Sequence, residues 1–335
     1  MPDSHLNGAE RGLQHSFRKS SIFNGLLMLG AVAAAYWPIR ALPSQHRLPP
    51  ATVPLEVSEV DLPMQKGPLR LAGAWELAAV DRRFGGLSAL AIDGSRFLAL
   101  TDRGAAIRFD FPTEATPQAQ LVDLRLGPGP FGKKWARDAE SLASDAQGRG
   151  WWVGYEQGHS LWLYDAGFDR ALGHIDLKRM KWRHNRGAEG LLNEGRHLLV
   201  TAENGRDAVR VKTGSIKRLT LNAGADVAEA ARAPDGSGWL LLRTMGLGGI
   251  EQSIAPLLRT RDGYRVGPGW PIPKGMFDNF EGMAIEARTN GSWRFWLTRD
   301  EGHRIMARTL MVALDYRPAG HSKSPATGAG LSNRP

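Results

Sequence analysis

A short phrase recurs five times along this chain and restricts its fold more than any other feature. Each copy places one key residue among small or apolar neighbours, and the key residues are Ser88, Glu140, Glu189, Glu229 and Glu281. They are separated by 52, 49, 40 and 52 positions. Each copy is followed by a gap of small and polar residues and then by an apolar segment that ends in charge. Repeats of this kind, built from strand-like segments, are typical of β-propeller blades.

The sequence therefore predicts an all-β chain that forms a single β-propeller, with five blades favoured because there are five repeats. Six blades remain an alternative if residues 55–62 and their surroundings form a blade without the phrase. The fifth repeat lacks an outer strand, whereas residues 69–77 alternate in the pattern of a strand. We expect this N-terminal strand to join the C-terminal blade and close the ring, because closure removes an open sheet edge.

Segments of different composition flank the repeats. Residues 1–17 are a polar N-terminal tail, and residues 18–37 are predicted to be a signal sequence or a membrane anchor, because Arg18 and Lys19 precede an apolar run. Residues 38–54 read as a stiff Pro-rich linker, residues 55–316 as the propeller, and residues 317–335 as a disordered basic tail. We expect the propeller on the periplasmic side of the inner membrane, tethered by the N-terminal segment or secreted after cleavage.

The basic charge of the chain belongs largely to its ends. The net charge is +9, and residues 1–50 and 317–335 each carry +3 of it. The body between them has no patch of interleaved basic and aromatic residues, so we expect no nucleic-acid partner. The expected contacts are a membrane through the N-terminal segment, and a small anionic substrate or an envelope protein through the propeller. The absence of cysteine excludes disulfides, thiolate metal sites and a cysteine nucleophile.

Chemistry is expected where the first strands of the blades meet around the central axis, because equivalent positions of the repeats converge there. The residues expected to hold a metal or activate water are Glu140, Glu189, Glu281 and Asp102. The residues expected to bind substrate are Arg103, Arg243, Arg299, Glu203, Asn204 and Glu229. Glu156 and Asp300 are expected as metal ligands. Such oxygen-rich groups suit Ca²⁺ or Mg²⁺, and Ca²⁺ is the cofactor that we expect, with no other. A close ring of carboxylates needs arginine, a cation or raised pKa values to be stable.

Other interpretations of these residues remain open. The repeated glutamates could instead form ion pairs that tie neighbouring blades together. Ser88 lies one glycine short of a nucleophile-elbow motif and lacks the strand–turn–helix context that this motif needs. His303 could approach the same mouth of the channel, and Trp135 and Trp182 are candidates for stacking on a ligand. Most of the other tryptophans in the repeats fall on strand patterns and are expected to pack between blades.

Several phrases together resemble those of one known family. They are the stretches at residues 84–88, 101–104, 138–141, 187–190 and 279–282. Across residues 69–315 the chain resembles the phytase-like domain family, whose members are exported bacterial β-propellers labelled as having esterase-like activity of phytase. The resemblance implies a propeller, export, and hydrolysis of a phosphoester or an ester. It does not extend residue by residue to the calcium ligands of β-propeller phytases, and Arg243 stands where the other repeats carry an acid.

Two functions follow as hypotheses. The first is a cell-envelope hydrolase that acts on a phosphorylated or ester substrate at an acidic and arginine-containing channel mouth. The alternative is a non-catalytic propeller that binds a ligand or a protein in the periplasm. Carboxylates that converge without arginine between them would favour the first hypothesis. Glutamates that are each paired to an arginine would favour the second, or a purely structural ring.

Overall fold

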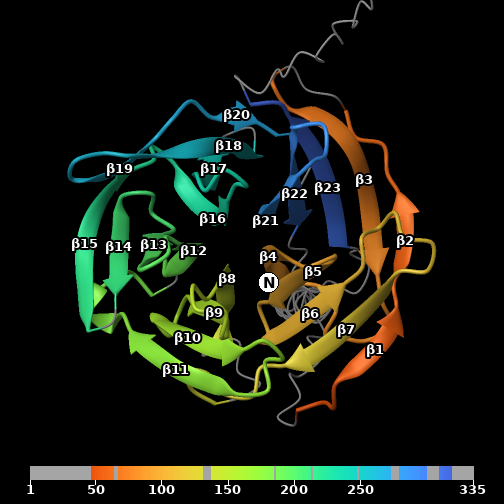
Figure 1. Cartoon of the computed structure of the whole chain (residues 1–335), viewed down its shortest axis with the longest axis horizontal. Helices are drawn as coiled ribbons and strands as arrows, with labels where there is room; N and C mark the ends of the chain where they lie inside the picture. Colours follow the sequence, from red (N-terminus) through yellow and green to blue (C-terminus); the bar gives the residue numbers. More distant parts are fainter. Residues whose placement is uncertain are drawn as a thin grey trace, which may run out of the picture. The chain divides into compact units, whose positions relative to one another are not determined.

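The computed structural model describes residues 47–63, 67–130, 137–184, 186–212, 214–246, 249–272, 279–299 and 309–318 (Figure 1). The predicted polar tail, the signal or anchor segment, most of the linker and most of the basic tail lie outside these residues. Within the described part of the chain, no helix is long and apolar enough to cross a membrane. The short 3₁₀ helix η1 (Lys178–Met180) interrupts a structure built otherwise from strands.

The first repeat forms most of the first sheet, and the second repeat forms the second sheet. The first sheet has the order β1 (Ala51–Pro54), β7 (Gln118–Asp123), β6 (Ala105–Phe109), β5 (Arg96–Thr101) and β4 (Leu87–Asp93). The second sheet has the order β11 (Ala171–Asp176), β10 (Ser160–Asp165), β9 (Gly150–Tyr155) and β8 (Ala139–Ser144).

The next sheet contains two repeats that are joined at their outer strands. Its third-repeat strands are β12 (Ala188–Asn193), β13 (Leu198–Ala202), β14 (Asp207–Lys212) and β15 (Ser215–Asn222). Its fourth-repeat strands are β16 (Asp226–Arg232), β17 (Gly238–Gly246), β18 (Gly249–Arg259), β19 (Gly263–Val266) and β20 (Trp270–Pro271). β19 pairs parallel with β15 and antiparallel with β18, which links the two repeats.

The last sheet brings the two ends of the propeller together. Its order is β2 (Glu56–Glu59), β3 (Arg70–Ala78), β23 (Thr309–Tyr316), β22 (Trp293–Arg299) and β21 (Phe280–Ala287). β3 pairs antiparallel with β23 from Leu77 opposite Thr309 to Arg70 opposite Asp315. The predicted closing strand is therefore confirmed, and it joins the C-terminal blade as expected.

The inner strands β4, β8, β12, β16 and β21 contact one another in a closed cycle around the centre of the ring (Figure 1). This arrangement confirms the all-β propeller fold. The segment at residues 55–62 forms no sheet of its own, because β2 pairs with β3. The linker prediction is wrong for residues 51–54, which form β1 on the edge of β7. Proline is compatible with this position, because an edge strand can leave some N–H groups unpaired.

Aromatic side chains hold the first and last sheets against each other. Trp296 is 1% exposed, and its ring centroid lies 5.0 Å from that of Phe97 and 5.8 Å from that of Trp75. Because large aromatic side chains bury more apolar surface than any others, this contact stabilises the closure of the ring. The predicted packing role of the strand tryptophans is confirmed here.

Candidate functional site

An irregularity at the start of each inner strand positions the key residues. The antiparallel pairing with the second strand shifts there by one residue, which is a β-bulge. The residues passed over in the pairing are Ser88, Glu140, Glu189, Ala228 and Glu281. Four of the five predicted positions are therefore equivalent. The predicted equivalence of Glu229 is wrong by one residue, because Ala228 occupies the bulge of β16.

The residues that follow the second strands also occupy one equivalent position. The N–H groups of Asp102, Glu156 and Glu203 donate to the carbonyls of Gly86, Asp138 and Gly187 at 3.0, 3.0 and 3.3 Å. Each acid is therefore the first residue after the second strand of its repeat, and it lies beside the bulge of the inner strand of that repeat. Arg243 takes this position in the fourth repeat, where Asp226 pairs opposite it.

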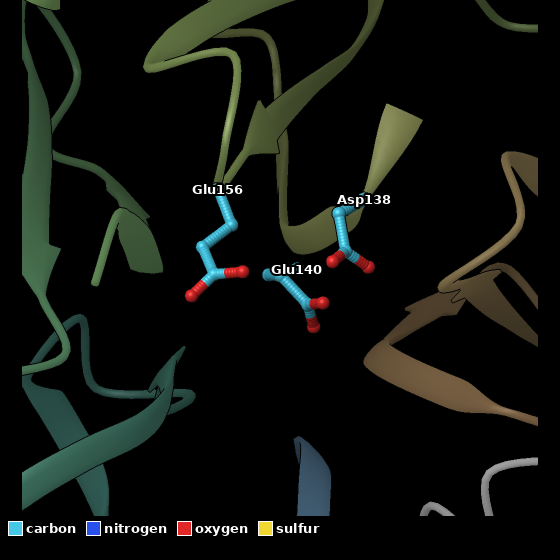
Figure 2. Close-up of side chains that lie close together, drawn as sticks. All are labelled: Asp138, Glu140 and Glu156. Atoms are coloured by element: carbon cyan, nitrogen blue, oxygen red, sulfur yellow. The ribbon is translucent and has the colours of Figure 1, made fainter. Parts of the chain in front are cut away.

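Two overlapping groups of carboxylates gather beside the second and third inner strands. Asp138, Glu140 and Glu156 each offer an oxygen within 4.8 Å of the others, and so do Glu156, Glu189 and Glu203. Figure 2 shows the carboxyl groups of the first group directed toward the same region. Glu156, which belongs to both groups, is 9% exposed, and Glu189 is 7% exposed. The structure thus brings Glu140, Glu156, Glu189 and Glu203 together, and it adds Asp138.

The electrostatics of this cluster are unfavourable for several ionised carboxylates. Burial raises the pKa of Glu140 well above its ordinary value, and the carboxylates of Asp138, Glu189 and Glu281 raise that pKa further. Burial is likewise the largest cause of the raised pKa of Glu189, followed by Glu156 and other acids. A divalent cation or shared protons would relieve this repulsion.

The raised pKa values predict how stability depends on pH in a chelator. Below the ordinary value of 4.5 the stabilising contribution of protonated Glu189 is fully present, and it is lost as the pH rises through the raised pKa. The unfolding free energy is therefore expected to fall as the pH rises above 4.5, by about 1.4 kcal/mol for each unit of pKa shift that is titrated. Glu189→Gln should flatten this decline. Urea unfolding at a series of pH values measures it, and equal slopes for both proteins would contradict the prediction.

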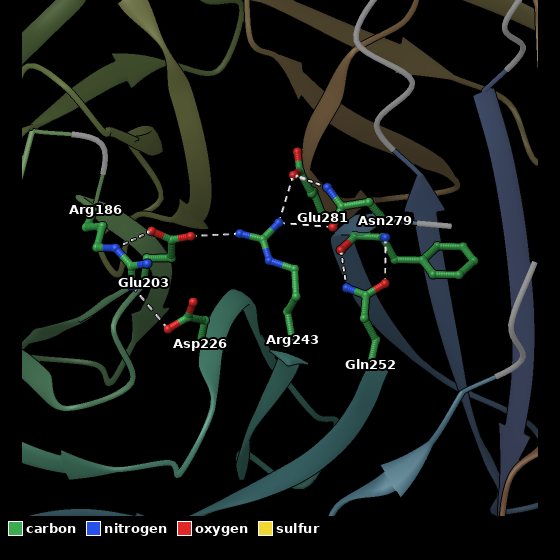
Figure 3. Close-up of polar contacts among 8 residues, drawn as sticks. Arg186, Glu203, Asp226, Arg243, Gln252, Asn279 and Glu281 are labelled. Carbon is green, nitrogen blue, oxygen red and sulfur yellow. Dashed lines mark hydrogen bonds and ion pairs between the residues drawn. The ribbon is translucent and has the colours of Figure 1, made fainter. Parts of the chain in front are cut away.

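Arg243 lies between two acids from different repeats (Figure 3). Its Nη2 lies 2.8 Å from Oε1 of Glu203, and its Nη1 lies 3.2 Å from Oε1 of Glu281 and 3.0 Å from Oδ1 of Asn279. The side chain is 17% exposed. Burial opposes the charge of the guanidinium, but the surrounding acids, Glu281 first, outweigh it, so the pKa of Arg243 is raised. Arg243 therefore links the third, fourth and fifth repeats.

Further residues support this ion-pair network. Arg186 lies 3.6 Å from Glu203 and 3.2 Å from Asp226, measured between side-chain nitrogen and oxygen. Gln252 donates to the carbonyl of Phe280 at 2.7 Å and accepts from its N–H at 2.8 Å, which holds the start of β21 (Figure 3). Sequence reasoning did not assign a role to Gln252, Asn279 or Asp138. Asp138 and Asn279 had a local signal, because each opens the phrase that contains the key glutamate of its repeat, Glu140 or Glu281.

Three other predicted site residues belong to neither of the two carboxylate groups. Glu229 is 1% exposed, and its Oε1 accepts a hydrogen bond from the Ala230 N–H at 2.8 Å, so it is closed off from solvent. Asn204 caps a turn by accepting from the N–H groups of Arg206 and Asp207 at 2.9 and 3.0 Å. Asp102 is 4% exposed at the equivalent position of the first repeat.

The predicted arginines differ in their surroundings. Arg103 is half-buried, and no described residue forms an ion pair with it. Arg299 is half-buried and has an interaction partner. Asp300, His303 and Trp135 lie outside the described residues. Trp182 is 8% exposed and packs edge-on against His159 at 6.2 Å, which is the geometry of a core residue.

The surroundings of Ser88 indicate a structural role. Its side chain is 1% exposed, and its hydroxyl donates to the backbone carbonyl of Ala139 on the neighbouring inner strand. A second carbonyl, that of Leu100, lies 3.5 Å from the same oxygen. The hydroxyl thus joins two inner strands, and the geometry gives no support to its use as a nucleophile.

Fold and site together define a β-propeller with an oxygen-rich acidic cluster beside its axis and an arginine that bridges three repeats. The family model described as "Phytase-like: Esterase-like activity of phytase" matches residues 82–250, just over half of the chain. The chain belongs to this phytase-like family. No curated protein matches it.

Solved structures similar to this chain share little sequence with it. Glutaminyl cyclase from Myxococcus xanthus is 12% identical, with a TM-score of 0.48, and the match covers 75% of this chain and 97% of that one. The Pan2 WD40 domain from Neurospora crassa is 9% identical, with a TM-score of 0.40 over 76% and 98% of the two chains. Hydrazine synthase from Kuenenia stuttgartiensis is 13% identical, with a TM-score of 0.39 over 65% of this chain, which spans only 57% of the synthase chain.

Proposed function

We propose that this protein is a cell-envelope hydrolase that acts on a phosphoester or an ester at the acidic cluster beside the propeller axis. The observation that carries the proposal is the convergence of the two carboxylate groups on Glu156. Membership of the phytase-like family supports the same reaction class. The proposed location is the periplasmic side of the inner membrane, with residues 18–37 as anchor or signal.

The carboxylate groups fit a hard divalent cation, and we propose Ca²⁺. Their donor atoms are all carboxylate oxygens, which Ca²⁺ prefers, and burial with mutual repulsion raises the pKa values of Glu140 and Glu189. Glu156 would hold the ion together with a neighbouring carboxylate, either Asp138 of the first group or Glu189 of the second. When bound, it would polarise an oxygen of the substrate and offset the negative charge that develops there.

The side chains of the site would divide the remaining work. Glu140 would accept a proton from the attacking water or donate one to the leaving group, because burial and the neighbouring acids raise its pKa and so favour its binding of a proton. Arg103 would contact the anionic part of the substrate with its guanidinium fork. Arg243 would hold Glu203 and Glu281 in place rather than bind substrate, since its Nη1 and Nη2 atoms already contact these acids.

Hydrolysis assays test the proposal directly. The purified protein is expected to hydrolyse p-nitrophenyl phosphate or p-nitrophenyl acetate in millimolar Ca²⁺ and to lose this activity in a chelator. The control is the same preparation after readdition of Ca²⁺, which should restore the rate. Rates no higher than the protein-free reaction with both substrates would contradict the hydrolase proposal.

A non-catalytic binding protein is the second candidate. The ion pairs of Arg243 and Arg186 favour it, because they satisfy acids that a catalytic site would leave available. It predicts a saturable anionic ligand and no turnover. Isothermal titration with inorganic phosphate, in Ca²⁺ and in chelator, separates the two candidates when combined with the assays above.

A further inference from the structure

The outer edge of the second sheet differs from that of the other sheets in the described residues. The outer strand β7 is covered by β1, β3 by β2, and β15 by β19, while β18 pairs with β19 and β20. β11 pairs with β10 alone. An unpaired edge presents a row of N–H and C=O groups that can pair with another extended segment.

The pairing register identifies which groups of β11 face outward. The N–H of Leu177 donates to the carbonyl of His159 at 2.7 Å, and Ile175 and Gly173 lie opposite Leu161 and Leu163. Hydrogen-bonded and non-hydrogen-bonded pairs alternate along an antiparallel ladder. The N–H and C=O groups of His174 and Asp176 therefore point away from β10, toward the free edge.

A groove adjoins this edge between the second and third repeats. It has a volume of about 990 Å³ and is lined by residues of β11, of the turns at 145–149 and 193–197, and of β14 and β15. A Cβ atom at Gly173 would meet nothing within 4 Å, so there is free space over this face of β11. Leu172 is 43% exposed, and Ile175 and Ile216 are half-buried beside it. The groove therefore offers apolar surface next to unpaired backbone groups.

The charges around the groove are mainly positive. Arg149 and Asp145 neutralise each other, with 2.8 Å between Nη2 and Oδ1. The remaining lining charges are the exposed cations Arg179, Arg196 and Lys212 and one acid, Asp176. Because like charges repel, this rim disfavours a second copy of the same surface. It also disfavours residues 1–46 and 319–335 of this chain, which carry net positive charge.

We propose that β11 and the adjoining groove bind an extended acidic segment of a partner protein, which pairs with β11 as an added strand. Main-chain hydrogen bonds to His174 and Asp176 would supply affinity, as in other cases of strand addition. Alternate apolar side chains would pack on Leu172 and Ile175, and acidic side chains would face Arg179 and Lys212. This inference goes beyond the proposed hydrolysis and does not depend on it.

The test uses a fluorescein-labelled peptide of alternating valine and glutamate and the intact protein. Fluorescence anisotropy is expected to show saturable binding, and a valine–lysine peptide is expected to bind at least tenfold more weakly. His174→Pro removes an outward N–H and should weaken binding at least fivefold. His174→Ala is the matched control, because it loses the same stacking contact with Trp162 but keeps the N–H.

Charge reversal gives a second test that keeps the strand intact. The double variant Arg179→Glu, Lys212→Glu is expected to weaken binding at least tenfold, whereas Arg261→Glu, in an exposed turn outside the groove, should leave it unchanged. Equal binding of both peptides, no saturable binding, or equal affinities of the proline and alanine variants would overturn the proposal. Self-association in sedimentation that His174→Pro abolishes would also overturn it, because the occupant would then be a second copy.

Discussion

Glu156→Gln is expected to lower the hydrolysis rate at least 100-fold, the lower range of what a positioned acid–base or metal-binding group contributes. Glu156 is the residue shared by both carboxylate groups, so its loss affects each of them. The amide keeps the size of the side chain but removes the charge that a cation requires. Initial rates in saturating Ca²⁺ measure the effect on turnover.

The same substitution should remove the stabilisation by Ca²⁺. Free Ca²⁺ at a hundredfold excess over its Kd stabilises a native protein by about 2.7 kcal/mol when the unfolded chain does not bind it. Thermal unfolding of the wild type is therefore expected to shift upward in Ca²⁺, and Glu156→Gln should shift little. Glu114→Gln, in the exposed turn between β6 and β7, is the matched control and should behave as wild type. An unchanged Ca²⁺ shift in Glu156→Gln would rule out this cluster as the cation site.

Arg243→Met is expected to destabilise the fold by about 3 kcal/mol at pH 7.5, because removing one partner of a buried ion pair leaves the other charge uncompensated. Methionine retains much of the aliphatic stem, so the loss reports on the guanidinium. Glu203 and Glu281 would then face each other and Glu189 without a cation between them. The loss should be smaller near pH 4.5, because the raised pKa of Glu189 keeps that carboxyl protonated there and removes its share of the repulsion.

Urea unfolding in chelator measures this effect. Arg186→Met is the matched control: it also removes a cation from Glu203, but its side chain is 38% exposed, and exposed pairs contribute under about 1 kcal/mol. If the two variants lose equal stability, Arg243 is not the bridge that holds the repeats together. If Arg243→Met keeps full stability and loses only phosphate binding, the arginine serves the ligand instead.

Much of the fold could be predicted because the strands of each repeat follow one another in the sequence. Each repeat contains its own antiparallel strands, so hydrophobic alternation and turns indicate them directly. The closing strand could also be predicted, since residues 69–77 lie before the first repeat and the fifth repeat lacks an outer strand. The positions of β1 and β19 could not be predicted from local patterns. β1 pairs with β7 across about 70 residues, and no short-range signal encodes that contact.

The candidate site, like the fold, could be predicted only in part from local sequence patterns. Spacing predicted that Asp102, Glu203 and Arg243 occupy one structural position, because each follows the key residue of its repeat by 14 positions. The strand pairing agrees, and it adds Glu156 to the same position. Spacing placed Glu229 with Glu189, but the bulge of β16 falls at Ala228, so Glu229 turns into the protein interior. A one-residue shift reverses the face on which a strand residue lies, and only the pairing decides where that shift occurs.

The sequence by itself determined a ring of antiparallel sheets with an acidic inner position, because strand periodicity and repeat length are local properties of the chain. Only the tertiary structure decided which acids lie around Glu156 and which acids Arg243 bridges. It also decided that, among the described residues, the second sheet ends at β11 without an added fifth strand. These features depend on contacts between residues tens to hundreds of positions apart. Arg243 and Glu281, 38 residues apart, meet only because two repeats stand side by side around one axis.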